Sequence, residues 1–284
     1  WRLIRRLRAE RFDTILLLTN SLRTALLAFA SGAPRRIGFD RYGRGLLLTD
    51  RLYHQRDGRR FVPAPVIDEY LKLAYALGCP TESYRIELAT LPEDDERADS
   101  VWQSLGLPRE RRVVVLNSGG AYGAAKLWPT EYFTELARRL ATQHGRHVLV
   151  ICGPSERDLA RQITRDAAHP HVVSLADAPL SLGLSKACVR RAELMVTTDS
   201  GPRHFAAAFE VPVVTLFGPT HIAWSENHYP RAVHLQKPVP CGPCQRRVCP
   251  LGHHRCMREL TVDEVERCVA AQLQPPAARG LHAA

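Results

Sequence analysis

The chain has 284 residues, 45% of them apolar, which is long enough to bury two modest cores, so two domains are expected. Its formal net charge of +10 favours anionic partners such as nucleotide phosphates, phosphorylated lipids or nucleic acid, but charge alone does not choose among them. No apolar run reaches the roughly 18–20 residues that span a bilayer, so a transmembrane helix is excluded and a soluble or peripheral protein is expected.

The first part of the chain predicts a partial α/β domain over residues 1–92. A β-rich run, a helix with a good N-cap, a short strand and an amphipathic helix follow one another at 12–20, 21–30, 35–39 and 68–77. The opening residues lead straight into a strand instead of a signal peptide, so the chain is expected to begin inside a domain.

The second part predicts a complete α/β domain over residues 93–274. A polar, acidic stretch around Pro92 marks the boundary, and a helix is expected over 94–105. Continuous apolar strands alternate with helical stretches, at 113–117, 147–152, 172–174, 194–198 and 213–217. This alternation implies a parallel, doubly wound sheet. The Pro- and Ala-rich end, 275–284, is expected to be a disordered tail.

Small and cationic residues follow the first strand of the second domain. Ser118, Gly119 and Gly120 come directly after the strand at 113–117, and ligands of open α/β sheets bind at the carboxyl ends of strands. Lys126 precedes a Trp-Pro pair that opens the next helix, so its ammonium is expected near the same edge, where a cation would neutralise a departing diphosphate. A tight turn and a solvated lysine are the alternatives.

The segment TTDSGPRHFAAAF offers several anion contacts after a later strand. Ser200 and Gly201 precede a predicted helix, so their amides and the helix dipole suit a phosphate. Asp199 is a candidate for orienting a ribose hydroxyl or a cation, and His204 for donating to a phosphate oxygen. Thr220, after the following strand, is a further ligand contact. A capped helix with a core-facing histidine, and a plain turn, are the alternatives.

Four cysteines lie within sixteen residues of a loop at 241–256, at Cys241, Cys244, Cys249 and Cys256, with two histidines beside them. This density predicts a structural zinc or iron–sulfur site, although the spacing matches no standard ribbon or ferredoxin. Reduced thiols in a loop, and disulfides or a redox role, stay open as alternatives. The other four cysteines are scattered in apolar or helical contexts and suit a reducing cytoplasm.

Five segments together resemble the ADP-heptose:lipopolysaccharide heptosyltransferases, glycosyltransferase family 9, and most of all the heptosyltransferase II group: VLNSGG, AAKLWP, CGPSE, TTDSGPRHFAAAFEVPVVTLFGPTH and CGPCQRRVCPLGHHRCM. The resemblance implies a GT-B fold, in which two Rossmann-like doubly wound domains face each other, the N-terminal one incomplete here. It also implies inverting, metal-independent transfer of heptose from ADP-heptose to the lipopolysaccharide inner core, with no cofactor required.

The motifs and the resemblance together give the candidate donor-binding residues, which are Ser118, Gly119, Lys126, Glu156, Asp199, Ser200, Gly201, His204 and Thr220. Lys126 and His204 are expected to stabilise the leaving group, and Glu156 is implied as a nucleoside contact. Family members carry a candidate catalytic Asp near an N-terminal Gly-rich turn, and this chain begins after that turn. The catalytic base is therefore expected to be absent from the chain.

The resemblance implies that the N-terminal domain binds an anionic lipid A-core acceptor at the inner leaflet of the inner membrane, as a cytoplasmic, peripheral protein. Five arginines are candidates for the basic face that would meet acceptor and membrane phosphates, namely Arg23, Arg35, Arg36, Arg41 and Arg44. Two alternatives stay open: a noncatalytic sugar-nucleotide or lipid-binding protein, and a GT-B enzyme using another nucleotide sugar. No nucleic-acid motif supports a nucleic-acid partner.

Overall fold

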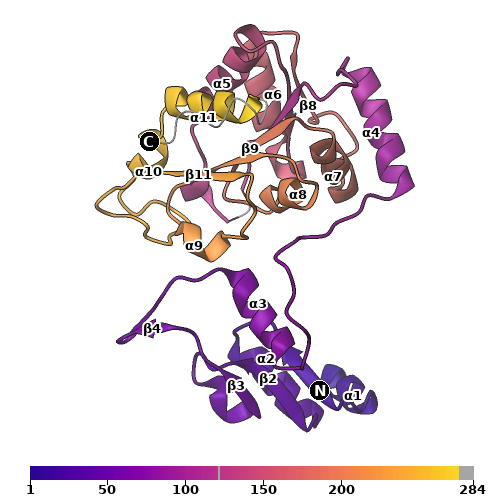
Figure 1. The fold of residues 1–284 in the computed structure, drawn as a ribbon, viewed down its shortest axis with the longest axis vertical. Helices are drawn as coiled ribbons and strands as arrows, with labels where there is room; N and C mark the ends of the chain where they lie inside the picture. The colour runs from indigo at the N-terminus through magenta and orange to yellow at the C-terminus, as the bar shows by residue number, and fades with distance from the viewer. Residues whose placement is uncertain (121, 275–284) are drawn as a thin grey trace. The chain divides into compact units, whose positions relative to one another are not determined.

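The computed structural model describes residues 1–120 and 122–274, so the expected tail at 275–284 lies outside the described residues. Contacts divide the chain into two compact units (Figure 1). Unit 1 comprises residues 1–84 together with 223–228, and unit 2 holds the rest of the described chain. Residues just before Pro92 belong to unit 2 because Lys186 and Arg190 donate hydrogen bonds to Ala89 and Thr90, both at 2.7 Å.

Unit 1 is built around a three-stranded parallel sheet in the order β1-β2-β3. Its elements are α1 (Arg2–Ala9), β1 (Thr14–Leu17), α2 (Leu22–Ser31), β2 (Arg35–Phe39), η1 (Arg44–Leu47), β3 (Asp50–Leu52), the hairpin β4 (Arg56–Asp57) and β5 (Arg60–Phe61), and α3 (Val66–Tyr75). The Ser21 hydroxyl accepts a hydrogen bond from the Thr24 amide at 3.1 Å, which confirms the predicted N-cap of α2.

Arg44 is a structural residue of unit 1, since its side chain is fully buried. Its guanidinium donates to the Phe39 carbonyl and the Asn20 amide oxygen, both at 2.8 Å, and to the carbonyl of Thr19. These bonds join the ends of β1 and β2. The expectation that Arg44 lies on a basic face is therefore wrong, and Arg35, which pairs with Asp50 at 3.0 Å, is also committed to an internal contact.

Unit 2 contains a six-stranded parallel sheet whose strands are β6 (Val113–Asn117), β7 (His147–Ile151), β8 (Val172–Ser174), β9 (Leu194–Thr198), β10 (Val213–Phe217) and β11 (Ala232–Gln236). The order β11-β10-β9-β6-β7-β8 is that of a dinucleotide-binding Rossmann fold. The predicted doubly wound sheet is confirmed, with β11 as a strand that the sequence reading did not include. The topological switch point lies between β6 and β9, where such folds bind ligands.

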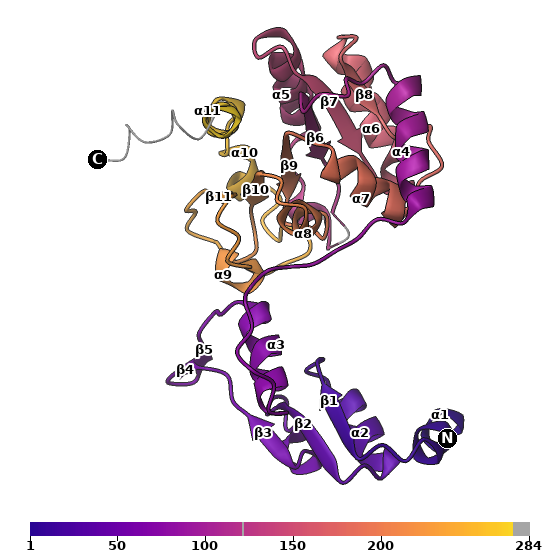
Figure 2. The same cartoon turned by 45° about the vertical axis from the view of Figure 1, so that its right-hand side comes forward.

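Helices cover both faces of this sheet (Figure 2). One face packs against α5 (Thr130–Thr142), α6 (Arg157–Ala167), α10 (Arg255–Arg258) and α11 (Val262–Leu273). The other packs against α4 (Pro92–Ser104), α7 (Leu182–Arg190) and α8 (Arg203–Ala208). Within β6, Val114 and Leu116 face the first layer while Val113 and Val115 face the second, the alternation of a strand buried on both sides.

The remaining short elements are η2 (Ala124–Lys126), η3 (Pro154–Glu156) and α9 (Ile222–Ser225). The first two follow the carboxyl ends of β6 and β7, and α9 follows β10. Across the helices of the described residues, none combines the length and the apolar character needed to cross a bilayer.

Candidate functional site

The switch point is closed by a network that ties the end of β6 to the end of β9. Asn117, the last residue of β6, donates from its side-chain amide to the hydroxyls of Thr197 at 2.9 Å and Ser200 at 2.8 Å. The Thr198 hydroxyl donates to the Gly119 carbonyl at 2.7 Å. These bonds hold the Ser118–Gly119 and Ser200–Gly201 segments side by side, as their positions after neighbouring strands predict.

Lys126 and Asp199 form a buried ion pair at this edge, with exposed fractions of only 8% and 6%. The ammonium donates to the Asp199 carboxylate at 2.6 Å and to its backbone carbonyl at 2.9 Å. The Thr220 hydroxyl donates to the same carboxylate oxygen at 2.7 Å. Lys126 and Thr220, predicted from separate segments of the chain, therefore meet at the carboxylate of the third predicted residue, Asp199.

A second cation, which sequence reasoning missed, lies against the same carboxylate. Arg203 is 1% exposed, and its guanidinium nitrogen lies 3.8 Å from an Asp199 carboxylate oxygen. The Asp199 carboxylate thus contacts both Lys126 and Arg203. Because charge interactions are strong where water is excluded, these cations make the edge favourable for an anion. The signal in the sequence was the arginine that opens α8, directly beside the SGP turn.

Glu156 braces the glycine turns that follow β6 and β7. Its carboxylate accepts hydrogen bonds from the amides of Gly120 at 3.0 Å and Gly153 at 2.8 Å. A Cβ on Gly119 would lie only 2.0 Å from this carboxylate, so a larger residue there would displace the Glu156 side chain. Glu156 is therefore held at the predicted edge, where its carboxylate fixes the turn backbone.

Ser118, Gly201 and His204 complete the candidate set. The Ser118 hydroxyl is buried without a hydrogen-bond partner in residues 1–120 and 122–274, which leaves it available to a ligand. Gly201 is exposed, and a Cβ there would meet open space. Burial, with a smaller effect of the Arg203 charge, lowers the pKa of His204 to about 4. His204 is consequently neutral near pH 7 and offers one ring N–H instead of a positive charge.

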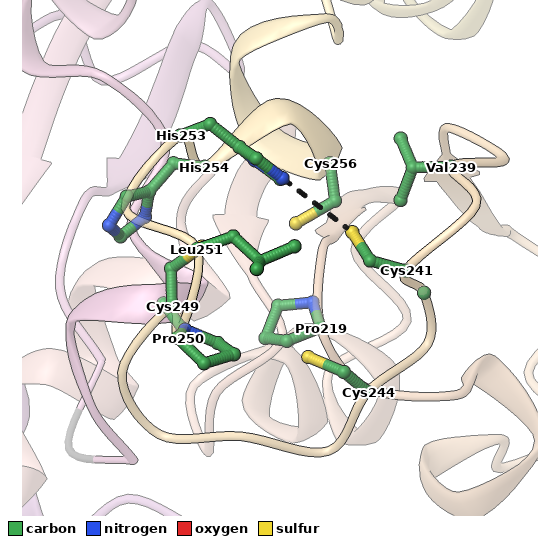
Figure 3. Close-up of a pocket in the computed structure, with 12 residues that line it drawn as sticks. Pro219, Val239, Cys241, Cys244, Cys249, Pro250, Leu251, His253, His254 and Cys256 are labelled. Carbon is green, nitrogen blue, oxygen red and sulfur yellow. Dashed lines mark hydrogen bonds between the residues drawn. The ribbon is translucent and has the colours of Figure 1, made fainter.

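The four cysteines of the 241–256 loop line a small cavity of about 30 Å³ (Figure 3). The Cys241 sulfur lies 3.9 Å from a ring nitrogen of His253, and the figure draws Pro219 and Leu251 among the cysteine side chains. All eight cysteines are free thiols. Throughout residues 1–120 and 122–274, no group of three or more His, Cys, Asp or Glu side chains is arranged to hold a metal ion. The arrangement gives the zinc or iron–sulfur prediction no support.

Comparison with known proteins identifies the family. Residues 1–255 match the family described as glycosyltransferase family 9 (heptosyltransferase). The chain belongs to this family. A curated relative, lipooligosaccharide heptosyltransferase 2 of Campylobacter jejuni subsp. jejuni serotype O:2, is 30% identical over 161 residues, which are 55% of this chain and 49% of the relative. Lipopolysaccharide heptosyltransferase 2 of Escherichia coli K12 is 26% identical over 224 residues, 75% of this chain and 62% of the relative.

Solved structures of this family share the fold. The glycosyltransferase family 9 protein of Veillonella parvula DSM 2008 superposes with a TM-score of 0.76 at 21% identity, covering 96% of this chain and 77% of that one. E. coli ADP-heptose lps heptosyltransferase II gives a TM-score of 0.71 at 24% identity, covering 96% and 80%. The predicted family and GT-B fold are confirmed. The chain spans about half the length of the Campylobacter relative and less than two thirds of the E. coli one.

Proposed function

We propose that the chain belongs to an inverting glycosyltransferase that moves heptose from ADP-heptose to the lipopolysaccharide inner core, on a heptosyl-Kdo-lipid A type acceptor. The observation that carries this proposal is the buried cluster of Lys126, Arg203 and Thr220 around Asp199 at the switch point. The named activity of the curated relatives supports it, as does the solved E. coli heptosyltransferase WaaC with ADP-2-deoxy-2-fluoro heptose.

In this proposal the cluster stabilises the departing ADP. Inverting transfer passes through an oxocarbenium-like transition state in which negative charge builds on the leaving diphosphate. Lys126 would donate to a diphosphate oxygen with the N–H that Asp199 does not use, while the Ser118 hydroxyl and the amides of Ser200 and Gly201 add neutral donors. His204 would donate as a neutral imidazole, because its lowered pKa keeps it uncharged.

Calorimetric titration of the chain with ADP, UDP and GDP tests the donor site. We expect ADP to bind more tightly than the other two diphosphates, and AMP to bind more weakly than ADP because it lacks the second phosphate. Tighter binding of UDP or GDP than of ADP would favour another nucleotide sugar. If no nucleotide bound to a folded chain, the donor-site proposal would be wrong.

A cavity in unit 1 is the proposed acceptor side. It measures about 350 Å³, large enough for one sugar ring, and lies at the carboxyl ends of β1 and β2. Asn20, Arg41 and Glu69 supply polar groups to its wall, and Tyr70 and Trp224 supply aromatic rings. Aromatic faces together with a guanidinium suit an acidic sugar, which supports the anionic lipid A-core acceptor.

The proposed location is the cytoplasmic face of the inner membrane. The exposed arginines of α1, which are Arg2, Arg5, Arg6 and Arg8, give unit 1 a basic surface. Such surfaces bind anionic lipids, and salt screens the attraction. We expect the chain to sediment with vesicles that contain anionic lipid at low salt, and to be released at high salt. Equal binding to neutral vesicles, or binding that ignores salt, would contradict this electrostatic attachment.

A further inference from the structure

The Lys126 ammonium has an aromatic neighbour that none of the functional motifs includes. Tyr122 lies with its ring centroid 4.4 Å from the Lys126 nitrogen. The guanidinium of Arg247, from the cysteine-containing loop, lies 5.2 Å from the same ring centroid. The tyrosine ring thus contacts two cations that come from separate parts of the chain. A ring face attracts a cation electrostatically but does not neutralise it as a carboxylate does.

Loop residues Gln245–Arg247 hold the segment that carries Lys126. The Tyr122 hydroxyl donates to the Gln245 carbonyl at 2.8 Å, and the Ala125 amide donates to the Arg247 carbonyl at 3.0 Å. Between them, Gly123 has a φ of +151°, and a Cβ there would lie 2.4 Å from the Arg247 carbonyl oxygen. The loop backbone therefore approaches so closely that only glycine fits at this position.

The same loop also reaches the segment that carries Thr220. The Gln245 amide donates to the Pro219 carbonyl at 2.8 Å. Lys126 and Thr220 are both hydrogen-bond donors to one oxygen of Asp199. One short stretch of the cysteine-containing loop is consequently bonded to both segments whose side chains meet at that carboxylate.

We propose that Tyr122, held by Gln245–Arg247, is a positioning residue that sets where the Lys126 ammonium lies for the diphosphate of the donor. This inference rests on the proposed function. The ring flanks the ammonium while Asp199 takes two of its three N–H groups, so the remaining N–H is kept in a restricted direction. A lysine that is oriented before binding loses less side-chain freedom when the anion arrives.

A double-mutant cycle in the full chain tests the proposal with ADP as the probe. We expect Tyr122→Leu to weaken ADP binding about fivefold, the scale of a partly desolvated cation–π contact, and Tyr122→Phe to weaken it less because the ring is kept. In a Lys126→Met background, Tyr122→Leu should have no further effect on ADP, since the residue acts through the lysine. AMP binding should change less than ADP binding.

The outcomes separate the two proposals. If Lys126→Met itself leaves ADP binding unchanged, the proposed donor role of the lysine is wrong. If Lys126→Met weakens ADP binding but Tyr122→Leu does not, only the positioning role is overturned. Full additivity of the two changes would also overturn it, because Tyr122 would then act independently of the lysine.

Gly123→Ala tests the loop contact by a second route. The added methyl should push the Arg247 backbone away and weaken ADP binding. Alanine would be strained at this φ, and its methyl would clash with a backbone atom that cannot easily move. The matched control is Gly106→Ala, which has a φ of +62° but open space around a Cβ. We expect the control to lower stability without changing ADP binding. Equal ADP binding by the two folded variants would contradict the role of the loop.

Discussion

We expect the Lys126→Met variant to bind ADP roughly 10- to 100-fold more weakly than the parent chain, the loss that about 1.5–3 kcal/mol of charge-assisted hydrogen bonding produces. The lysine is buried and already oriented by Asp199, so its ammonium adds to binding without a large cost in side-chain freedom. Titration calorimetry with ADP measures the change directly.

Two controls separate binding from folding in this experiment. Lys126→Met removes the lysine from its buried ion pair with the Asp199 carboxylate, and breaking such a pair costs about 3–5 kcal/mol of stability. A variant with Asp199→Asn as well removes both charges and should recover part of that loss without recovering ADP binding. Lys186→Met removes a lysine that donates to the Ala89 carbonyl outside the cluster, and should leave ADP binding intact. Full ADP affinity in folded Lys126→Met would refute the leaving-group role.

The sequence was sufficient to predict the sheet of unit 2 because its strands are continuous apolar runs. These runs are only five residues long and rich in β-branched side chains, which favours buried strands over helices, and they alternate with longer helical stretches. The small residues after β6 and β9 could then be placed at one edge, because parallel strands end on the same side. β11 was missed because its residues are only half-buried and include His234 and Gln236.

Side-chain partners were less accessible to sequence reasoning. A pattern identifies an arginine but not whether it is buried, so Arg203 was passed over and Arg44 was assigned to a surface. Arg44 is placed partly by a contact with Asn20, which is distant along the chain, whereas Arg203 meets Asp199 only four residues away and was missed because burial is not visible in the sequence. The dense spacing of the cysteines likewise indicated a metal site, yet spacing does not determine whether the sulfurs converge, and the described arrangement does not bring them into a ligand set.

The protonation of His204 makes the stability of the folded chain depend on pH. Its pKa is about 4 in the folded protein against 6.5 for the ordinary side chain, mainly because burial disfavours the charged ring. The unfolded state therefore binds more protons between these two values, so stability is fully present above about pH 6.5 and is lost as the pH falls towards 4. The lowered pKa of His147, caused mainly by burial, acts in the same direction.

We expect the free energy of unfolding to fall by about 2 kcal/mol between pH 7 and pH 5 because of His204, since its pKa is lower in the folded state than in the unfolded state. His204→Gln, which cannot titrate, should reduce the slope of unfolding free energy against pH by that amount, measured by urea denaturation at both values. Three glutamates also stabilise the folded state in a pH-dependent way, because hydrogen bonds from Arg, Lys and His partners lower their pKa values: Glu135, Glu264 and Glu266. Their contribution to stability is lost at lower pH than this window. Identical slopes for parent and variant would mean that folding does not lower the pKa of His204, and the ring would then gain its charge near pH 6.5.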